Sequence, residues 1–337
     1  MVRNVMGESS GRLSYSYMSL YRNCERAFYH RYRQGIGLRG GSPPYLTTGS
    51  ALHAGTDSLW MDGWDLEVAE HALLTEWGDY VTPRNSDLGY MTEGHALNIL
   101  RCYYEREPFK GIEPIKLLFD DLNFSVLEKI NATVNERGEL YMNEVPLGVR
   151  LPFNGEELRF TAKVDFPAMG ATGPTIIDRK CKVGWLNEWS IAKSIGVNHQ
   201  LRLYTYIMRE LTGMPFDTGM IEGIYIGEYA TDDEAKWAKR KSVPFKMFGP
   251  FIFSDAELEE TLRWASQTQA DIARRDEMQA ELESEYPELA WPQNDKGGCG
   301  SCEFKDLCDL PDFARPAAVR QGYEERGRFD TFGKGNK

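Results

Sequence analysis

Two aspartates, Asp165 and Asp178, are spaced so that a single β-hairpin would bring them close enough to share a cation. They lie in two runs rich in β-forming residues, Phe160–Phe166 and Thr175–Cys181, which flank the turn sequence Gly-Ala-Thr-Gly-Pro. This pattern is typical of a hairpin. If the hairpin is symmetric, its centre falls between the alanine and the threonine of the turn, and the two aspartates lie opposite each other. The sequence therefore predicts a pair of carboxylates on neighbouring strands.

Lys180 follows Asp178 by two positions and would share its side of the sheet. Side chains alternate along a strand, so Asp178 and Lys180 point to one face while Arg179 points to the other. Two carboxylates and an ammonium group on one patch are costly to desolvate unless a cation pairs with them. We therefore predict a divalent-metal site with a catalytic lysine beside it. The alternative is a surface hairpin with solvated charges, because a single Asp-x-Lys triplet is a weak signal.

A second group of residues that could do chemistry is a set of three cysteines within ten residues: Cys299, Cys302 and Cys308. Their spacing predicts a metal site that needs a fourth ligand, and four thiolates suit either tetrahedral zinc or an iron–sulfur cluster. Of the other cysteines, Cys102 lies in an apolar helical stretch and is expected in the core. Cys181 adjoins Lys180, so as a ligand it would put the thiolate-bound metal in the site predicted at the two aspartates. Cys24 is therefore the best candidate for the fourth ligand.

Three further polar residues become informative only in combination. Gln200 and Tyr204 are four residues apart on a predicted helix and therefore share one face. His53 lies in the first turns of another predicted helix, after Gly-Ser-Ala-Leu. Taken singly, these residues fit an amphipathic helix with an incidental glutamine and a packed histidine.

The composition is that of an ordinary globular protein, with 42% hydrophobic and 27% charged residues in a chain of 337. No apolar run approaches the length of a membrane span, and the first residues lack the apolar core of a signal peptide. We therefore expect a cytoplasmic protein with no membrane partner, whose six cysteines are ligands or buried thiols. The net charge of −12 argues against a surface coated in non-specific nucleic-acid-binding groups. Five arginines between Arg22 and Arg39 still form a local basic stretch, which is either a solvated helix face or a phosphate contact.

The order of the predicted elements indicates an α/β fold. Helical patterns follow Ser14 as far as Arg33, and then cover residues 47–60, 66–80, 92–107, 190–211 and 255–284. Strand patterns cover residues 115–119, 122–130, 142–151, the two hairpin runs, 220–227 and 243–253. Helices, then a mixed sheet with an embedded helix, then a helix and a cysteine cluster suggest an α/β core under a helical cap.

In combination, these motifs make the chain resemble the PD-(D/E)XK nuclease superfamily. Within it, the chain is most similar to the branch with the RecB and AddB nuclease domains and the CRISPR-associated exonucleases with four-cysteine clusters. The motifs follow the family's order between Ser14 and Leu310: a serine-rich helix start with Cys24, Gly-x-x-x-His with His53, Asp165 on a strand, Asp-x-Lys with Asp178 and Lys180, Gln-x-x-x-Tyr with Gln200 and Tyr204, and the final Cys-x2-Cys-x5-Cys. Glu144 resembles the acidic residue that often opens the family's core strands.

The resemblance implies a restriction-endonuclease-like core, with a central mixed β-sheet flanked by helices, and it assigns roles. His53, Asp165 and Asp178 would coordinate Mg²⁺ or Mn²⁺ together with the backbone carbonyl of Arg179. Hard carboxylates suit Mg²⁺, and histidine suits Mn²⁺ as well. Lys180 would orient or deprotonate the attacking water and balance charge on the phosphorus centre.

The resemblance also assigns residues outside the hairpin. Gln200 and Tyr204 would position DNA or brace the site. A 4Fe–4S cluster, in preference to zinc, would join both ends of the chain through four cysteines: Cys24, Cys299, Cys302 and Cys308. Two positions depart from the family's pattern, because Arg179 replaces an apolar or aromatic residue and Cys181 replaces a small hydroxyl residue. Arg179 puts a charge on the face opposite the metal, so either that face is wetter or the arginine has an acidic partner.

The function that the resemblance implies is a metal-dependent DNA nuclease, an exonuclease that acts on single-stranded DNA ends. The chain has no Gly-x4-Gly-Lys-Ser/Thr loop, so unwinding would need a helicase or recombination partner. The alternatives are a nuclease-like DNA-binding or assembly subunit with weak cleavage, and a zinc-knuckle interaction protein. We divide the chain into a flexible tail (1–13), an N-terminal helical region (14–110), a nuclease core (111–253), a C-terminal helix with the cysteine cluster (254–310) and a basic tail (311–337).

Overall fold

The fold is described from a computed structural model of the chain. The structure describes residues 12–39, 44–80, 89–109, 111–131, 136–183, 199–231, 236, 239, 243–282, 287–294, 299 and 302–325. Within these ranges, no helix combines the length and the apolar character that crossing a lipid bilayer requires.

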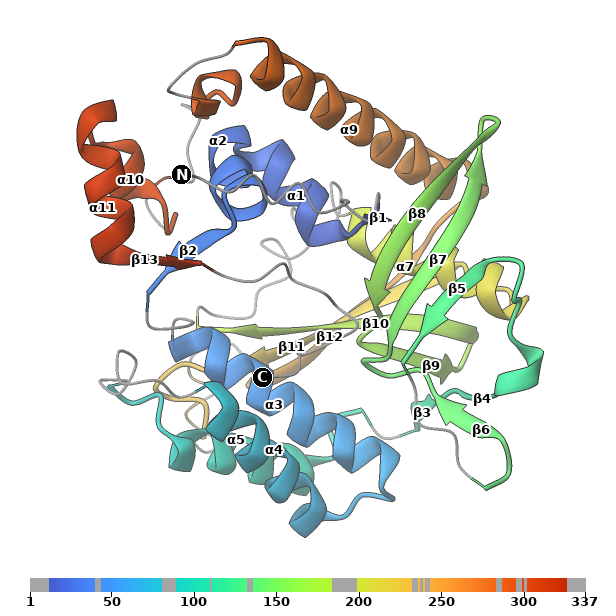
Figure 1. Ribbon diagram of the computed structural model, residues 1–337. Helices are drawn as coiled ribbons and strands as arrows, with labels where there is room; N and C mark the ends of the chain where they lie inside the picture. The colour runs from blue at the N-terminus through green and yellow to red at the C-terminus, as the bar shows by residue number, and fades with distance from the viewer. Residues whose placement is uncertain are drawn as a thin grey trace.

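Most helices lie toward the two ends of the described chain and most strands in its middle (Figure 1). The helices are α1 (Tyr15–Asn23), α2 (Glu25–Phe28), the π-helix η1 (Tyr29–Arg33), α3 (Pro44–Met61), α4 (Leu66–Tyr80), α5 (Glu93–Arg106), η3 (Phe119–Asp121), α7 (His199–Thr212), α9 (Asp255–Glu281), η4 (Pro287–Ala290), α10 (Lys305–Cys308), η6 (Asp312–Ala314) and α11 (Arg315–Gly322). The strands are β1 (Arg12–Leu13), β2 (Ile36–Leu38), β3 (Glu113–Pro114), β4 (Lys116–Leu118), β5 (Leu127–Ile130), β6 (Glu139–Tyr141), β7 (Pro146–Phe153), β8 (Glu156–Lys163), β9 (Phe166–Gly170), β10 (Gly173–Lys182), β11 (Thr218–Tyr225), β12 (Phe245–Ile252) and β13 (Tyr323–Glu325).

The largest described sheet has five strands in the order β12-β11-β10-β9-β3. Strands β10 and β11 are parallel, and α7 lies between them in the sequence; the other pairs in this sheet are antiparallel. Helices α3 and α7 both contact β10, and they lie on opposite sides of it in Figure 1. This arrangement confirms the predicted mixed sheet flanked by helices, and it makes β10 the central strand.

The predicted hairpin forms with the predicted register. Gly170 pairs with Gly173, and Phe166 pairs with Ile177 at the other end of the ladder. The expectation of a continuous first strand over Phe160–Phe166 was wrong, because this run is divided between two sheets. Strand β8 pairs with β7 and β1 in a four-stranded sheet, β1-β8-β7-β5, whereas β9 pairs with β10 and β3. Asp165 therefore lies in the bend where the chain leaves one sheet and enters the other.

The expected continuous N-terminal helix is broken at Cys24. The side chain of Ser14 caps α1 by accepting a hydrogen bond from the Tyr17 amide at 3.1 Å. The backbone at Cys24 is extended, with φ −161° and ψ 111°, so α1 ends before Cys24 and α2 begins after it. The break places the thiol at a junction between two helices.

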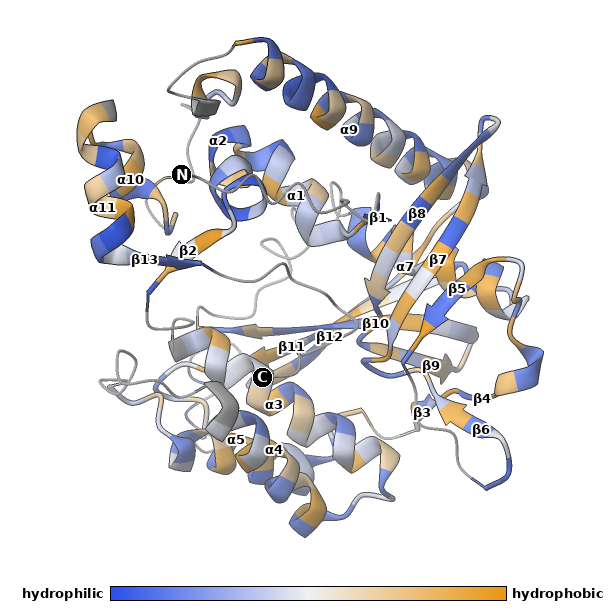
Figure 2. Ribbon diagram, viewed as in Figure 1, coloured by the Kyte–Doolittle hydropathy of each residue, from blue (hydrophilic) through white to orange (hydrophobic). Residues whose placement is uncertain are grey.

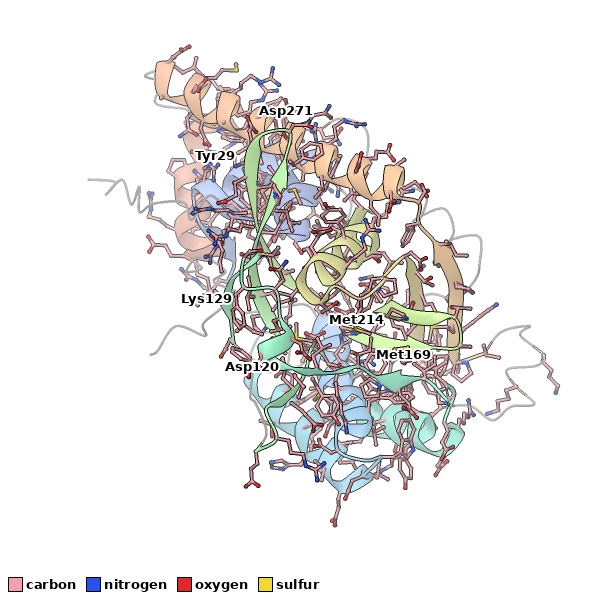
Figure 3. The ribbon with its side chains drawn as sticks, turned by 90° about the vertical axis from the view of Figure 1, so that its right-hand side faces the viewer. Tyr29, Asp120, Lys129, Met169, Met214 and Asp271 are labelled. Atoms are coloured by element: carbon pink, nitrogen blue, oxygen red, sulfur yellow. The ribbon has the colours of Figure 1, made fainter. Side chains whose placement is uncertain are left out.

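Helix α9 crosses over the N-terminal helices and is bonded to them through charged groups. Its first turn carries a capping box between Ser254 and Glu257. Much of its length is hydrophilic (Figure 2), as expected for a helix with one face against the protein. Asp271 of α9 lies near the N-terminal segment that contains Tyr29 in Figure 3, and Asp271 pairs with Arg22 of α1 at 2.9 Å. The helix thus ties the C-terminal half to the N-terminus.

The segment after Pro311, which we expected to be a tail, contains α11 and β13. Strand β13 pairs with β2 near the N-terminus, and Tyr323 is buried against Phe304. The burial of this aromatic ring accounts for the order of the segment. Two other elements are shorter than expected: β5 covers only the end of 122–130, and α7 begins at His199 in the described chain. The start expected for α7 at residue 190 lies outside the described residues.

Candidate metal and catalytic site

Helix α3 carries His53 close to β10, and Gly49 lies where the two elements meet. A Cβ atom at Gly49 would lie 3.4 Å from the Cβ of Cys181, which is ordinary van der Waals contact. The Cys181 thiol also lies 3.9 Å from the Gly49 carbonyl oxygen. The glycine that begins the Gly-x-x-x-His motif therefore lies at the contact between α3 and β10, and one turn later the same helix presents the histidine.

His53, Glu144 and Asp165 form a group of candidate metal ligands. One ligand atom from each lies within 4.8 Å of the others, and no other such group of His, Cys, Asp or Glu exists among the described residues. His53 Nδ1 lies 3.5 Å from Glu144 Oε1. Two carboxylates and an imidazole form a donor set that fits Mg²⁺ or Mn²⁺. The predicted ligands His53 and Asp165 are therefore brought together.

Glu144 is the member of this group that the sequence did not identify as a ligand. It sits in a turn before β7 with φ 55°, a left-handed conformation that is uncommon outside glycine. Its amide donates a 2.8 Å hydrogen bond to the Val164 carbonyl, which places it beside Asp165. Its carboxylate pairs with Lys163. Resemblance to an acidic residue at the start of a core strand was the only signal for Glu144 in the sequence.

Asp178 and Lys180 share one face of β10, as predicted. Lys180 Nζ donates a 2.8 Å hydrogen bond to Asp178 Oδ1. Asp178 is fully buried, and its Oδ2 accepts no hydrogen bond within the described part of the protein. Its ligand atoms lie outside the three-residue group, but its charge helps to raise the pKa of Asp165. A buried carboxylate oxygen without a partner is costly, and a bound cation would satisfy it.

The charges of the group are unbalanced without a cation. Burial, and then the charges of Asp178 and Glu144, raise the pKa of Asp165 to about 8. Burial opposes ionisation of Glu144 too, but hydrogen bonding to His53 and the charge of Lys163 prevail and lower its pKa to about 2. Burial likewise opposes protonation of His53, yet hydrogen bonds with Cys181 and Glu144 raise its pKa well above the ordinary value. A divalent cation would replace the protons on Asp165 and His53.

Gln200 and Tyr204 of α7 complete a hydrogen-bonded row that begins at Asp178. Lys180 Nζ also donates to Gln200 Oε1 at 3.3 Å, and Gln200 Nε2 donates to the Tyr204 hydroxyl at 3.4 Å. Burial opposes the charged form of Lys180, but the charges of Asp178 and Asp165 have the larger effect, so the pKa of the lysine is raised. Lys180 is therefore an ammonium group, which suits orientation and charge balance better than proton abstraction.

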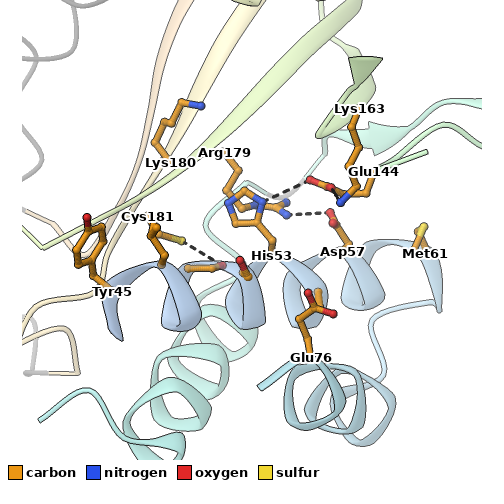
Figure 4. Close-up of a pocket in the computed structure, with 14 residues that line it drawn as sticks. Tyr45, His53, Asp57, Met61, Glu76, Glu144, Lys163, Arg179, Lys180 and Cys181 are labelled. Atoms are coloured by element: carbon orange, nitrogen blue, oxygen red, sulfur yellow. Dashed lines mark hydrogen bonds and ion pairs between the residues drawn. The ribbon is translucent and has the colours of Figure 1, made fainter. Parts of the chain in front are cut away.

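His53, Glu144 and Lys180 line a pocket of about 510 Å³ (Figure 4), whereas Asp165 and Asp178 are not among its lining residues. In the close-up, Lys180 points away from α3, whereas Arg179 and Cys181 point toward it. The pocket is lined by Tyr45, Leu46, Gly49, Ser50, His53, Ala54, Asp57, Met61, Glu76, Glu144, Lys163, Arg179, Lys180 and Cys181. Lys163 and Lys180 supply positive charge near the acidic group, as binding of a phosphodiester would require.

Arg179 points toward α3, on the face of β10 opposite Lys180, and has acidic partners there. Its Nη1 lies 2.8 Å from Asp57 Oδ1, and its Nε lies 2.6 Å from Glu222 Oε2. The side chain has no exposed surface. Of the two alternatives for this position, a wetter face or an acidic partner, the structure supports the second.

The arginines of the N-terminal basic stretch are engaged within the protein. Arg22 pairs with Asp271, Arg31 with Glu303, and Arg33 with Asp276. Arg26 donates to the Trp291 carbonyl, and Arg39 donates to the Arg320 and Tyr323 carbonyls. These contacts link the N-terminal helices to α9 and the C-terminal segment, so both earlier interpretations, a solvated face and a phosphate contact, miss the principal role of these side chains.

The predicted cysteine ligands come from both ends of the chain. Cys24, Cys302 and Cys308 pack against one small core that includes Phe304 and Leu307. Burial raises the pKa of Cys308 to about 11, with contributions from Cys302 and Cys24. Cys102 and Cys181, the alternatives to Cys24, pack against the main core instead. No three cysteine sulfurs in the described ranges lie within 4.8 Å of one another.

Residues 12–309 match the PD-(D/E)XK nuclease superfamily, and the chain therefore belongs to this superfamily. No curated protein matches the chain. A solved structure entitled "Crystal structure of SSO0001" is similar, with 12% sequence identity over 78% of this chain and 84% of that chain. The TM-score between the two structures is 0.26. The family and the acidic group together define a nuclease-superfamily member with a candidate divalent-metal site.

Proposed function

We propose that this protein is a metal-dependent DNA nuclease, an exonuclease that acts on single-stranded DNA ends. The observation that carries the proposal is that two groups of residues meet at one pocket, which is lined by His53, Glu144 and Lys180. His53, Glu144 and Asp165 form the candidate metal site, and Lys180 stands beside it on Asp178. Membership of the PD-(D/E)XK nuclease superfamily supports phosphodiester hydrolysis as the reaction.

The protein's own groups divide the work of the reaction. When bound, Mg²⁺ or Mn²⁺ would supply a Lewis acid and a water activated at neutral pH. His53, Glu144, Asp165 and the free Oδ2 of Asp178 would hold the ion, with the Arg179 carbonyl as the further ligand implied by the resemblance. Lys180 is held by Asp178 and Gln200 yet remains 44% exposed, so its ammonium group can donate to water or to a phosphate oxygen.

Features of the pocket rim support a single-stranded end as substrate. Tyr45 and Leu46 line the pocket and are 46% and 49% exposed. Exposed aromatic rings beside a site stack on unpaired bases, whereas duplex bases are already stacked. The arginines of the N-terminal stretch are bonded internally, which argues against a broad basic cradle for duplex DNA in that region. Unwinding would then come from a helicase or recombination partner, in DNA repair or recombination.

We also propose that Cys24, Cys299, Cys302 and Cys308 bind a 4Fe–4S cluster as a structural staple, which would place the chain in the RecB/AddB-like branch. Three of these cysteines share one small core, and Cys24 and Cys299 both influence the pKa of Cys302, which burial raises. A single tetrahedral zinc ion would hold its sulfurs roughly 3.8 Å apart, given Zn–S bonds of about 2.3 Å. No three of the described sulfurs lie within 4.8 Å of one another, and a cluster holds its cysteines further apart than zinc does, because each cysteine binds a different iron.

The test is a matrix of metals and DNA substrates. Wild-type protein is incubated with Mg²⁺, Mn²⁺ or EDTA and with end-labelled linear or circular DNA, single- or double-stranded. We expect Mn²⁺-dependent release of short products from linear single strands and no cutting of circles. Cutting of circles would replace the exonuclease proposal with an endonuclease, and DNA binding without cleavage in any metal would favour the nuclease-like binding subunit.

A lysine variant makes the same experiment specific to the site. Lys180→Met should lower the cleavage rate by about 100-fold or more, because it removes a charge positioned near the reacting phosphate. The matched control is Lys129→Met, an exposed lysine on β5 that does not line the pocket, and its rate should equal that of the wild type. Undiminished cleavage by Lys180→Met would count decisively against this assignment.

A further inference from the structure

Arg179 forms a fully buried ionic network on the face of β10 opposite Lys180. Its guanidinium bonds Asp57 of α3 at 2.8 Å and Glu222 of β11 at 2.6 Å. Glu222 is the cross-strand neighbour of Arg179 in the parallel ladder, and it also accepts a 2.5 Å hydrogen bond from the Tyr103 hydroxyl of α5. The guanidinium thus joins two strands and a helix, and Tyr103 joins a second helix.

The same residue also holds a candidate metal ligand through its main chain. The Arg179 amide donates a 2.8 Å hydrogen bond to Asp165 Oδ2. Asp57, the helix partner of its side chain, follows His53 by one turn on α3. Arg179 therefore contacts Asp165 directly and is connected to His53 through one helical turn of α3.

Stability alone does not explain why this network is ionic. Desolvating a buried ion pair costs about as much as its attraction returns, and apolar side chains of similar volume are often at least as stabilising. A guanidinium, however, fixes direction as well as distance, because its donors form a rigid planar fork. Here two arms of the fork are occupied by carboxylates from different elements, and both carboxylates are buried. The position of α3 and β11 relative to Arg179 is therefore fixed more tightly than apolar contacts would fix it.

We propose that Arg179 is a positioning residue for the metal site, in which its side chain fixes the distance of the His53 helix from β10 through Asp57 while its amide fixes Asp165. This inference rests on the proposed metal site of the nuclease. Partners that orient metal ligands typically contribute 10–100-fold to metal affinity. Loosening the Asp57 contact should therefore weaken metal binding without removing any ligand.

The experiment measures Mn²⁺ binding by titration calorimetry on the folded full-length protein, together with the thermal midpoint and the cleavage rate at saturating Mn²⁺. Asp57→Asn is isosteric and keeps one acceptor but loses the charge. We expect its Mn²⁺ Kd to rise about tenfold or more, with a cleavage rate at saturating Mn²⁺ within about threefold of wild type. The Mn²⁺ Kd of Arg179→Lys should lie between the values for the wild type and Asp57→Asn, because an ammonium group keeps the charge but lacks the planar fork of donors.

A control separates positioning from loss of stability. Asp276→Asn disrupts the bidentate pair with Arg33, between α9 and the N-terminal helices and away from the pocket. It should lower the thermal midpoint and leave the Mn²⁺ Kd unchanged. If Asp57→Asn behaves in the same way, with a lower midpoint and a wild-type Kd, Arg179 is only structural and the proposal is overturned.

The outcomes also separate this inference from the proposed function. If wild-type protein binds no Mn²⁺, the metal site itself is wrong. If wild-type protein binds Mn²⁺ and the Asp57→Asn variant binds it equally well, only the positioning role is wrong. Should Asp57→Asn fail to fold, Glu222→Gln provides the same comparison from the strand side, since Glu222 contacts Arg179 through its Oε2. Its Kd should also rise, and a wild-type Kd would again overturn the proposal.

Discussion

Asp165 and Asp178 occupy the two positions directly beyond the last paired residues of the β9–β10 hairpin, Phe166 and Ile177. Asp178 continues strand β10, whereas Asp165 lies in the bend that leads back to β8. Each aspartate accepts a hydrogen bond from a residue of β10. Asp165 accepts one from the Arg179 amide, and Asp178 accepts one from the Lys180 ammonium group. The end of one hairpin thus holds two acids with different partners, which leaves an oxygen of Asp178 available to a cation.

Glu144 should prove to be a metal ligand. Glu144→Gln keeps the shape of the side chain but removes the charge that faces His53 and Lys163. We expect Mn²⁺ binding to weaken by at least about tenfold, measured by titration calorimetry. Glu128→Gln is the matched control, because Glu128 is ion-paired with Arg12 at 3.2 Å and does not line the pocket. Equal Mn²⁺ affinity in the two variants would remove Glu144 from the site.

The metal-free protein should become less stable as the pH rises from about 4 to about 8. Burial, followed by the charges of Asp178 and Glu144, raises the pKa of Asp165 in the folded chain from 3.8 to about 8. Between these values the folded chain keeps a proton that the unfolded chain has lost, so raising the pH favours unfolding. Urea unfolding in EDTA at several pH values measures the slope.

Two comparisons identify Asp165 as the source of this slope. Asp165→Asn cannot titrate, so its stability should fall less over the same pH range. Mn²⁺ should stabilise the wild type more at pH 8 than at pH 5, because the ion competes with the proton on Asp165. A slope that is identical in wild type and Asp165→Asn would contradict the prediction.

Local rules predicted the hairpin, because register and face follow from the turn and from strand alternation. The symmetry of the turn gave the pairing of Phe166 with Ile177, and alternation gave the separation of Arg179 from Lys180. These relationships depend on residues within about twenty positions of one another. The predicted mixed sheet also followed from the order of local patterns.

Relationships between distant segments were beyond these rules. Glu144 reaches Asp165 through a left-handed turn and a main-chain bond to Val164, and neither leaves a periodic signal in the sequence. Asp57 and Arg179 are separated by 122 positions in the sequence. The sequence could therefore offer an acidic partner for Arg179 only as one of two alternatives, beside a wetter face, and could not identify Asp57. The break at Cys24 lies within a helical pattern, and the extended backbone there accompanies contacts with the C-terminal segment that only the tertiary fold provides.

Tyr45 should contribute to the binding of single-stranded DNA. Stacking on an unpaired base is worth about 1–3 kcal/mol, so Tyr45→Ala should raise KM for a single-stranded substrate by roughly 5- to 150-fold. Tyr45→Phe keeps the ring and should resemble the wild type. Tyr90→Ala is the control, because Tyr90 is also exposed, at 38%, but does not line the pocket. An unchanged KM in Tyr45→Ala would show that the bases pass elsewhere.

Loss of Cys24 should release iron and destabilise the whole protein. Cys24 joins the core that contains Cys302, Cys308, Phe304 and Leu307, and a cluster bound there would connect the two ends of the chain. Metal binding of this kind contributes directly to folding, so Cys24→Ala should lower the thermal midpoint and abolish broad visible absorption. The wild type, purified without oxygen, should be brown and contain about four irons per chain if the site is Cys₄.

The control for Cys24 is another cysteine with similar burial but a different neighbourhood. Cys102 packs against the main hydrophobic core, so Cys102→Ala should keep its iron and colour. Iron and zinc are counted by elemental analysis in both variants and the wild type. A colourless wild type with one zinc ion would replace the cluster with a zinc site. If Cys24→Ala keeps its metal and Cys102→Ala loses it, the fourth ligand is not at the helix junction. The two ends of the chain would then be connected by the arginine pairs with α9 and by the β2–β13 ladder.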